Sequence, residues 1–417
     1  MWKTRHLCTH VSKSGINVSG GTPARVAGIL AANLKELKVK ELVFAADTLA
    51  RTSVNDLNFW SQLCDRIKQD LKTTNVADIL KVVHALAKVP YKKVSFLNAV
   101  DRIVFQRHAC IEARALMQYF IDSNRLNHLE PNTFKAVIGS KLNMLSEFHA
   151  FDLCFMLHIA SKLQLLDPSI LDNVSDELCN NSANYEYLCK DKLLVAMVIR
   201  SLAFLQQHND LFKKLVYDRL PGCIYAFGAQ EMCNVIFSLV VGLQDETYNP
   251  AILDIFRVLL DRVSDNLKDM VDIEVNQLAI SLFHLRYKMP HFEDKYQMLL
   301  DNIIQLDLQF TPSTSKMQYK LSKLLDHLKV QYTAEKRIGP YVMDYVLPQL
   351  QIAIEVNGYS HFYHQSRDFN AITRLKYSIV ESLGWKVLSV NYFDWKNRSR
   401  QNKLEYLSSA IHTLYQA

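Results

Sequence analysis

A short motif recurs along residues 40–312 at intervals of 36 to 43 residues, and this regular spacing strongly limits the folds open to the chain. Each copy consists of an aspartate, a polar residue and an aliphatic residue. The copies are Asp65-Arg66-Ile67, Asp101-Arg102-Ile103, Asp176-Glu177-Leu178, Asp218-Arg219-Leu220, Asp261-Arg262-Val263 and Asp301-Asn302-Ile303, with a degenerate copy at Ser140-Lys141-Leu142. An internal period of this length is typical of helical-repeat proteins.

An apolar segment lies ahead of most copies, as expected for a first helix that pairs with the helix carrying the motif. These segments are 45–51, 82–88, 155–162, 198–204, 235–241 and 278–285. Because a two-helix repeat cannot bury its apolar stripes alone, successive repeats must stack on one another. The sequence therefore predicts a solenoid of about seven helical hairpins over residues 36–312.

The charged residues of the motif have two explanations. They form a polar pair on the outer face, or the aspartate contacts the next repeat. Alternatively, the motif arginines line the concave groove and bind phosphates. These arginines are Arg66, Arg102, Arg219 and Arg262.

Composition supports a mostly helical chain. Only 11 glycines and 10 prolines occur in 417 residues, and both residue types disfavour helix interiors. The eight cysteines include no C-x-x-C pair, and the longest apolar stretches fall well short of the roughly 20 residues that span a bilayer. We therefore expect no zinc site, no disulfide framework and no membrane partner.

The charge is unevenly distributed. Residues 1–35 carry five basic and no acidic side chains, and residues 317–417 carry a net charge of +5, whereas the intervening repeats carry −4. A basic, hydroxyl-rich, acid-free start is typical of an organelle transit segment. We predict import into the mitochondrial matrix, with an unstructured basic start as the alternative.

The periodicity changes at Lys316. The pattern predicts a helix from Met317 to Leu328 and a strand that ends at Pro348. Further elements are expected at 351–356 (strand), 373–383 (helix closed by Gly384), 385–392 (strand) and 398–415 (helix), with a possible extra strand at 330–333. This order predicts a small α/β domain behind the solenoid.

Several motifs in this domain resemble one family. They are the run from Tyr341 to Pro348, the run from Ile352 to Phe362, Thr373-Arg-Leu-Lys376, the run from Leu383 to Tyr392, and Asp394-Trp395. In this order they resemble the RAP domain, an RNA-binding domain abundant in apicomplexans, over residues 317–417. The resemblance implies a restriction-endonuclease-like fold. RAP domains commonly follow helical repeats in organellar RNA-metabolism proteins, such as heptatricopeptide and octotricopeptide repeat proteins and the FAST-kinase-domain family.

The resemblance to PD-(D/E)xK nucleases places Asp344 and Glu355 at the two carboxylate positions that hold a divalent metal such as Mg²⁺. Asn357 departs from the pattern, because many RAP domains have aspartate there and many nucleases have lysine. Lys376 could substitute for that lysine. In the other interpretation the carboxylates are structural, with Glu355 bonded to backbone amides or to His361.

Single-stranded RNA is bound by stacking on aromatic or guanidinium groups and by basic side chains on phosphates. The α/β domain interleaves both types. The candidates are Tyr359, His361, Phe362, Tyr363, Arg367, Arg374, Lys376, Lys396, Arg398, Arg400 and Lys403, whereas Trp385 and Trp395 are expected in the core.

Three hypotheses follow. In the favoured one the protein is no enzyme and needs no cofactor. It binds and stabilises or positions RNA, and we expect this to be mitochondrial ribosomal RNA, bound by a component of the mitochondrial ribosome or by an rRNA-processing factor. Ribosomal or other RNA-processing proteins are then expected partners. The alternatives are a Mg²⁺-dependent RNA endonuclease and a protein-binding scaffold.

Overall fold

The computed structural model describes residues 23–52, 55–265, 270–289, 292, 294–305 and 315–416. Most of the predicted transit segment therefore lies outside the described residues, as do residues 313 and 314 of the junction expected between 312 and 317. The chain divides into two compact units, one of residues 1–159 and 167–184 and the other of residues 160–166 and 185–417. The division falls inside the repeat array, so that the second unit combines the later repeats with the α/β domain.

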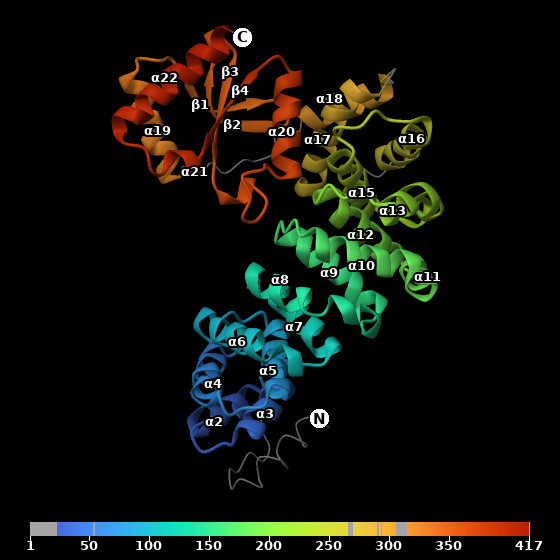
Figure 1. The fold of residues 1–417 in the computed structure, drawn as a ribbon, viewed down its shortest axis with the longest axis vertical. Coiled ribbons are helices and arrows are strands. Elements are labelled where there is room, and N and C mark those ends of the chain that lie inside the picture. The colour runs from blue at the N-terminus through green and yellow to red at the C-terminus, as the bar shows by residue number, and fades with distance from the viewer. Residues whose placement is uncertain are drawn as a thin grey trace. The chain divides into compact units, whose positions relative to one another are not determined.

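The repeat region consists of helical hairpins, as the motif spacing predicts (Figure 1). A helix α2 (Pro23–Asn33) precedes them. The described residues form seven hairpins. In chain order, these pair α3 (Val39–Arg51) with α4 (Leu57–Asp70), α5 (Val76–Lys88) with α6 (Val94–Arg107), α7 (Ala113–Arg125) with α8 (Pro131–Gly139), and α9 (Ala150–Lys162) with α10 (Pro168–Asn180). The later ones pair α12 (Lys192–Phe204) with a segment from α13 (Asp210–Lys213) to α14 (Leu220–Cys223), α15 (Ala229–Gly242) with α16 (Pro250–Ser264), and α17 (Asp272–Lys288) with α18 (Asp294–Gln305). An extra helix, α11 (Ser182–Lys190), lies between the fourth and fifth hairpins.

Local sequence explains where these helices begin. Asp56, Asn75, Asp167 and Asn249 each stand at the N-cap and accept a hydrogen bond from a backbone amide of the first turn. Proline follows at the first helical position of α10 and α16, where no amide hydrogen is needed.

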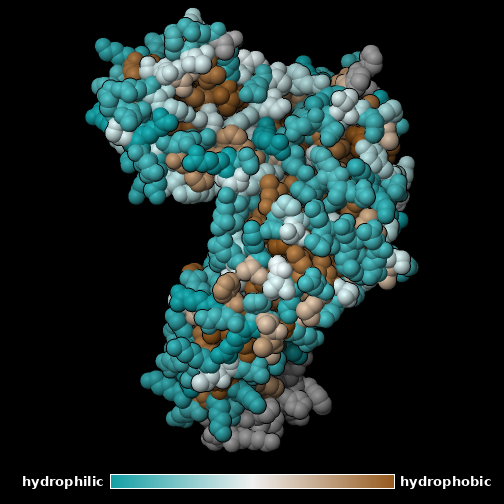
Figure 2. All heavy atoms as spheres, viewed as in Figure 1, coloured by the Kyte–Doolittle hydropathy of each residue, from teal (hydrophilic) through white to brown (hydrophobic). Residues whose placement is uncertain are grey.

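First helices of successive hairpins pack against one another, as α5 does on α3 and α15 on α12. Hydrophobic side chains fill the contacts between them. Hydrophilic residues cover most of the face drawn in Figure 2, and hydrophobic ones show in smaller patches among them. None of the helices in the described ranges is long and apolar enough to cross a membrane.

Three of the six motif aspartates, Asp65, Asp101 and Asp261, contact the next repeat. Asp65 lies 2.6 Å from Lys93 Nζ, Asp101 accepts from Tyr119 and pairs with His128, and Asp261 accepts from the Tyr296 hydroxyl at 2.8 Å. Two motif arginines contact the preceding segment instead. Arg219 donates to the Cys189 carbonyl, and Arg262 lies over the Tyr225 ring. In these copies the motif residues join neighbouring segments of the array, whereas Arg66 pairs with Asp70 and Asp301 accepts from Gln297 within their own helices.

The α/β domain contains a four-stranded sheet in the order β1-β2-β3-β4. Its elements are α19 (Lys316–His327), β1 (Thr333–Ile338), β2 (Tyr341–Leu347), β3 (Ile352–Asn357), α20 (Ala371–Ser382), β4 (Lys386–Asn391), α21 (Tyr392–Trp395) and α22 (Arg400–Gln416). β1, β2 and β3 are antiparallel neighbours, and β4 runs parallel to β3. Gly384, with φ of +86°, stands between α20 and β4, where its left-handed backbone needs no side chain.

The first strand and the short helix α21 differ from expectation. The sequence predicts a possible strand at 330–333, whereas β1 begins at Thr333 and pairs with residues 341–346 of β2. The exposed and polar side chains of β1 give little apolar alternation, which explains why the pattern misses this edge strand.

The two faces of the sheet are packed differently. α19 and α22 cover one face with an apolar core that includes Leu325, Leu407 and Ile354 (Figure 1). α20 covers the other face, where Val380 packs on Val346 and Ala353. Glu355 and Asn357 follow Ala353 on alternate positions of β3, so this second face also carries polar side chains.

Candidate functional site

The two carboxylates predicted at the sheet come from neighbouring strands but have different partners. Asp344 Oδ2 accepts the backbone amide of Val356 at 2.7 Å, and its Oδ1 accepts from Gln318 Nε2 at 2.5 Å. Because Gln318 belongs to α19, Asp344 ties β2 both to β3 and to a helix. Both of its oxygens thus serve the fold.

Glu355 forms a buried ion pair with Lys376, which reaches down from α20. The Lys376 Nζ and Glu355 Oε1 are 2.5 Å apart, and their side chains are only 15% and 7% exposed. Burial raises the pKa of Glu355 to about 7, while the Lys376 charge opposes this rise and the Asp344 charge adds to it. Glu355 Oε2 has no hydrogen-bond partner among the described residues.

Asn357 fills the position where the nuclease pattern has a charged residue. Its Nδ2 donates to the Tyr377 hydroxyl at 2.6 Å and to Ser389 Oγ at 2.7 Å, and it lies 3.2 Å from Asn391 Oδ1. The side chain is fully buried. The sequence showed that Asn357 departs from the nuclease pattern. It did not reveal the partners of Asn357, which belong to α20 and β4.

These residues do not fit a metal centre. Asp344 is fully hydrogen-bonded, Glu355 gives one oxygen to a lysine, and the third position is an amide. Among the described residues no group of three His, Cys, Asp or Glu side chains is placed to hold a metal ion. Mg²⁺ is usually held by one or two carboxylates together with waters and phosphates. Because both oxygens of Asp344 and one oxygen of Glu355 are engaged by protein groups, we derive no step through Mg²⁺.

His361 lies beside this cluster. Its Nδ1 is 3.5 Å from Thr373 Oγ1, and its backbone carbonyl accepts from the amide of Asn370. Burial lowers the pKa of His361, and the Lys376 charge acts in the same direction. The histidine therefore joins the loop after β3 to the start of α20. The sequence suggested a bond between Glu355 and His361, and the described residues form no such bond.

Tyr359 begins an aromatic cluster at the end of β3. Its ring is 61% exposed and lies 4.7 Å from the Tyr392 ring and 5.0 Å from the Phe393 ring, centroid to centroid. Lys396 Nζ lies 5.6 Å from the Tyr392 centroid. Sequence reasoning missed Tyr392 and Phe393; the signal available for them was only their place directly after a strand.

Two of the other predicted aromatic contacts are buried. Phe362 is 2% exposed and stacks on Phe369, and Tyr363 is 4% exposed. Neither ring presents a face for RNA in this structure. Trp395 is buried and Trp385 is partly buried, as expected for core residues.

The remaining basic residues among the RNA-binding candidates lie mainly after β4. Arg367 is 77% exposed and pairs with Asp394 of α21 at 3.3 Å. Arg398 lies over the Tyr406 ring, Lys403 lies over the Trp395 ring, and Arg400 is exposed. The structure therefore brings Tyr359, Arg367 and Lys396 into one neighbourhood through α21. Arg398 lies against Tyr406 of α22, and Lys403 of α22 lies against Trp395 of α21.

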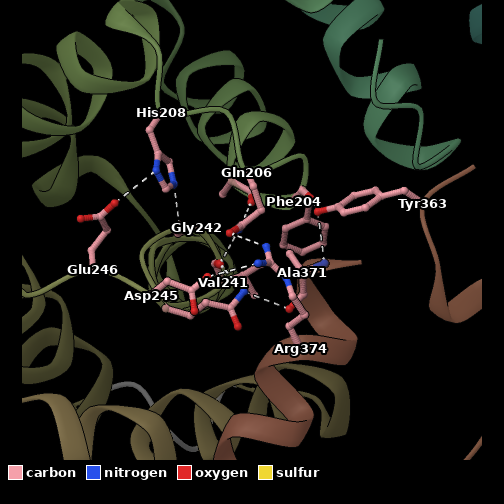
Figure 3. A network of polar contacts seen from close by, with 12 residues as sticks. Phe204, Gln206, His208, Val241, Gly242, Asp245, Glu246, Tyr363, Ala371 and Arg374 are labelled. Atoms are coloured by element: carbon pink, nitrogen blue, oxygen red, sulfur yellow. Dashed lines mark hydrogen bonds and ion pairs between the residues drawn. The ribbon is translucent and has the colours of Figure 1, made fainter. Parts of the chain in front are cut away.

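Arg374 lies elsewhere, on the side of α20 that packs on the later repeats. Its guanidinium donates to Gln206 Oε1 at 2.8 Å and lies 3.3 Å from Asp245 Oδ2. Figure 3 shows this network, in which Tyr363 also donates to the Phe204 carbonyl. Arg374 thus holds the two parts of the second compact unit together.

Further contacts strengthen this junction. Gln244 is buried and donates to the carbonyls of Val241 and Ala371. At the turn between β1 and β2, Gly339 has φ of +56°, and a Cβ there would lie 2.6 Å from Leu383 and 3.3 Å from Phe283 of α17. Glycine is favoured at this turn because its φ is positive and because a Cβ would meet first Leu383 of the same domain and then Phe283 of the repeats.

Comparison with known proteins agrees with this arrangement. The family model described as the RAP domain matches residues 354–410, which begin in β3 and end in α22. A curated relative, "RAP domain-containing protein, chloroplastic" of Oryza sativa subsp. japonica, is 24% identical over 293 residues. The match covers 68% of this chain and 43% of the relative, so the chain spans less than half the length of that relative.

Proposed function

We propose, from the RAP domain that this chain carries at residues 354–410, that the protein binds RNA in an organelle. The observation that carries the proposal is the group formed by Tyr359, Arg367 and Lys396 with Tyr392 and Phe393. An exposed ring stacks on a nucleobase regardless of sequence, and neighbouring cations neutralise phosphates. The group offers both kinds of contact on one surface of the domain.

The junction with the repeats supports a continuous binding track. Arg374 and Gln244 fix α20 against the later repeats, so that a strand bound to the domain has repeats beside it. Helical repeats that bind RNA commonly contact about one nucleotide each. The net charge of −4 over residues 36–316 indicates that phosphate contacts concentrate on the α/β domain.

The organelle we propose is the mitochondrion, and the RNA is ribosomal RNA that the protein stabilises or positions as a ribosome component or a processing factor. The basic, acid-free residues 1–35 support import, and the chloroplast named for the rice relative is likewise an organelle. A reporter fused to residues 1–35 tests import directly. Retention of the reporter in the cytosol would contradict this part of the proposal.

The first test is crosslinking of RNA to the purified native protein, followed by sequencing of the bound fragments. We expect defined ribosomal RNA fragments, and an association that weakens steeply as salt is raised from 50 to 200 mM, because phosphate contacts release counterions. Salt-insensitive association with proteins and no RNA would instead favour the scaffold hypothesis.

The same RNA tests the endonuclease hypothesis. The wild-type protein, Glu355→Gln and the exposed control Glu405→Gln are incubated with the RNA and Mg²⁺. We expect intact RNA in all three cases, because Asp344 and Glu355 are engaged by protein groups. Cleavage that needs metal and is lost only in Glu355→Gln would make the protein a nuclease.

A further inference from the structure

A pocket of about 550 Å³ lies beside the loop that follows β3, at the edge of the aromatic cluster. Its volume falls in the range of small-molecule sites. The lining residues are Tyr359, Tyr363, His364, Gln365, Ser366, Arg367 and Phe393. Two aromatic rings of the proposed RNA surface, Tyr359 and Phe393, thus form walls of a defined cavity with Arg367 at its side.

The loop around this pocket is held by its own hydrogen bonds. The Tyr363 amide donates to the Asp368 carbonyl at 3.1 Å, and the Ser366 amide donates back to the Tyr363 carbonyl at 3.0 Å. Gln365 adopts a left-handed backbone conformation with φ of +56° to complete the turn. A loop fixed in this way binds its ligand without a large ordering cost.

The later repeats hold the loop from its other side. Gln164, directly after α9, accepts the His364 amide at 2.8 Å, and its own Nε2 donates to the Ser360 carbonyl at 3.3 Å. Tyr363 donates its hydroxyl to Phe204 (Figure 3). The pocket therefore keeps a fixed position beside the repeats of its own compact unit.

The chemistry of the walls favours a planar, hydrogen-bonding group attached to a negative charge. Tyr359 and Phe393 meet edge to face, at 78° between ring planes, so one ring presents its face while the other closes the side. Arg367 pairs with Asp394 but is largely exposed, so its guanidinium can also bind a phosphate. His364 Nε2 is buried beside the pocket and has no hydrogen-bond partner among the described residues.

We propose that this pocket takes one unstacked nucleobase of single-stranded RNA, with the Tyr359 ring against the base and Arg367 on the adjacent phosphate. The inference rests on the proposed RNA binding and adds a single-nucleotide subsite to it. The strand bound there is thereby set in register with the repeats, because Gln164 and Phe204 position the loop.

The test uses the full-length protein and the RNA fragment recovered by crosslinking, made as a series with one abasic residue at each position in turn. Binding is measured for the wild type, Tyr359→Ala and Arg367→Ala. The matched controls are Tyr415→Ala, whose ring is 60% exposed in the same domain, and Lys323→Ala, a cation 61% exposed beside its own carboxylate. Tyr359→Phe keeps the ring and should bind like the wild type.

We expect Tyr359→Ala to weaken binding about tenfold, and the controls to change it less than about twofold. One abasic position should weaken binding of the wild type to a similar extent and add nothing in Tyr359→Ala, because both changes remove the same contact. Free mononucleotides should not compete at concentrations equal to the RNA.

Three outcomes would overturn the inference. If no position couples to Tyr359 while the wild type still binds RNA, the subsite fails and the proposed function stands. If the wild type binds no RNA, both fail together. If free mononucleotides displace the RNA at equal concentration, the pocket serves a small nucleotide and not the RNA strand.

Discussion

Buried carboxylates have different tasks in the repeats and in the RAP domain. In the repeats they bind the neighbouring hairpin: Asp101 accepts from Tyr119 and Asp152 pairs with Arg114. In the RAP domain Glu355 contacts only groups of its own domain and keeps one oxygen without a partner in the described structure. The comparison teaches that Asp101 and Asp152 join neighbouring hairpins, whereas Glu355 is bonded within its own domain. Among the described residues, buried side-chain atoms without a partner occur in both regions, such as Ser175 Oγ in the repeats and Glu355 Oε2 in the RAP domain.

Replacing Lys376, the cation that pairs with Glu355 in the RAP domain, should have the largest effect on stability. Lys376→Met leaves Glu355 buried without its partner, and we expect a loss of about 3–5 kcal/mol in the free energy of unfolding. Urea unfolding followed by hydrogen exchange of β3 and α20 measures it. The double variant Lys376→Met/Glu355→Gln should recover most of the loss, and the exposed Lys323→Met should change little. A single variant as stable as the wild type would show that the pair is not buried in solution.

The pH dependence of stability should have opposite signs in the two regions. In the repeats, burial lowers the pKa of His284 to about 4 from its ordinary 6.5. The unfolded chain then binds a proton that the folded chain does not, so stability falls as pH drops from 6.5 to 4, by up to about 3 kcal/mol. His284→Gln should remove this acid sensitivity, whereas the exposed His412→Gln should not.

Glu355 gives the matching test in the RAP domain. Because its folded pKa is about 7 against an ordinary 4.5, the folded chain keeps a proton that the unfolded chain releases between these values. Its contribution is complete below pH 4.5 and is lost as pH rises to 7. In urea unfolding measured across the same pH range, we expect Glu355→Gln to reduce this loss of stability. An unchanged profile would mean that Lys376 keeps the carboxylate charged throughout.

A hydrogen bond between repeats should have a smaller effect. Tyr119→Phe removes the buried hydroxyl that donates to Asp101 and leaves His128 as the remaining partner. We expect a loss of about 2 kcal/mol in the free energy of unfolding, with RNA affinity unchanged at temperatures where the variant is folded. Tyr415→Phe is the exposed control. A loss of RNA affinity in the folded variant would contradict a purely structural role.

The smallest effect is expected at the junction inside the second compact unit. Arg374→Ala removes a partly exposed ion pair with Asp245 and the bond to Gln206, worth about 0.5–1 kcal/mol. Hydrogen exchange should rise in α20 and in the loop after α15, and Arg398→Ala should leave both unchanged. If Arg374→Ala instead weakens RNA binding without faster exchange there, the side chain contacts RNA, as the sequence alone predicts.

Sequence patterns predicted the elements well and their contacts poorly. The hairpins follow from apolar periodicity, and all but one of the RAP strands follow from alternation bounded by turns. Phe362 and Tyr359 are indistinguishable in sequence as aromatic residues after a strand, yet one is 2% exposed and the other 61%. Phe393 contacts both rings, whereas Phe369, which comes from another segment, stacks on Phe362.

By itself the sequence determined the repeat period, the helical hairpins and the order of the RAP motifs, because these depend on residues near one another along the chain. Tertiary structure alone decided that Asp344 bonds to Val356 and Gln318, that Asn357 bonds to Tyr377 and that Arg374 faces the repeats. Arg374 and Gln206 are 168 residues apart in sequence. Such contacts depend on how whole elements pack, which no local period encodes.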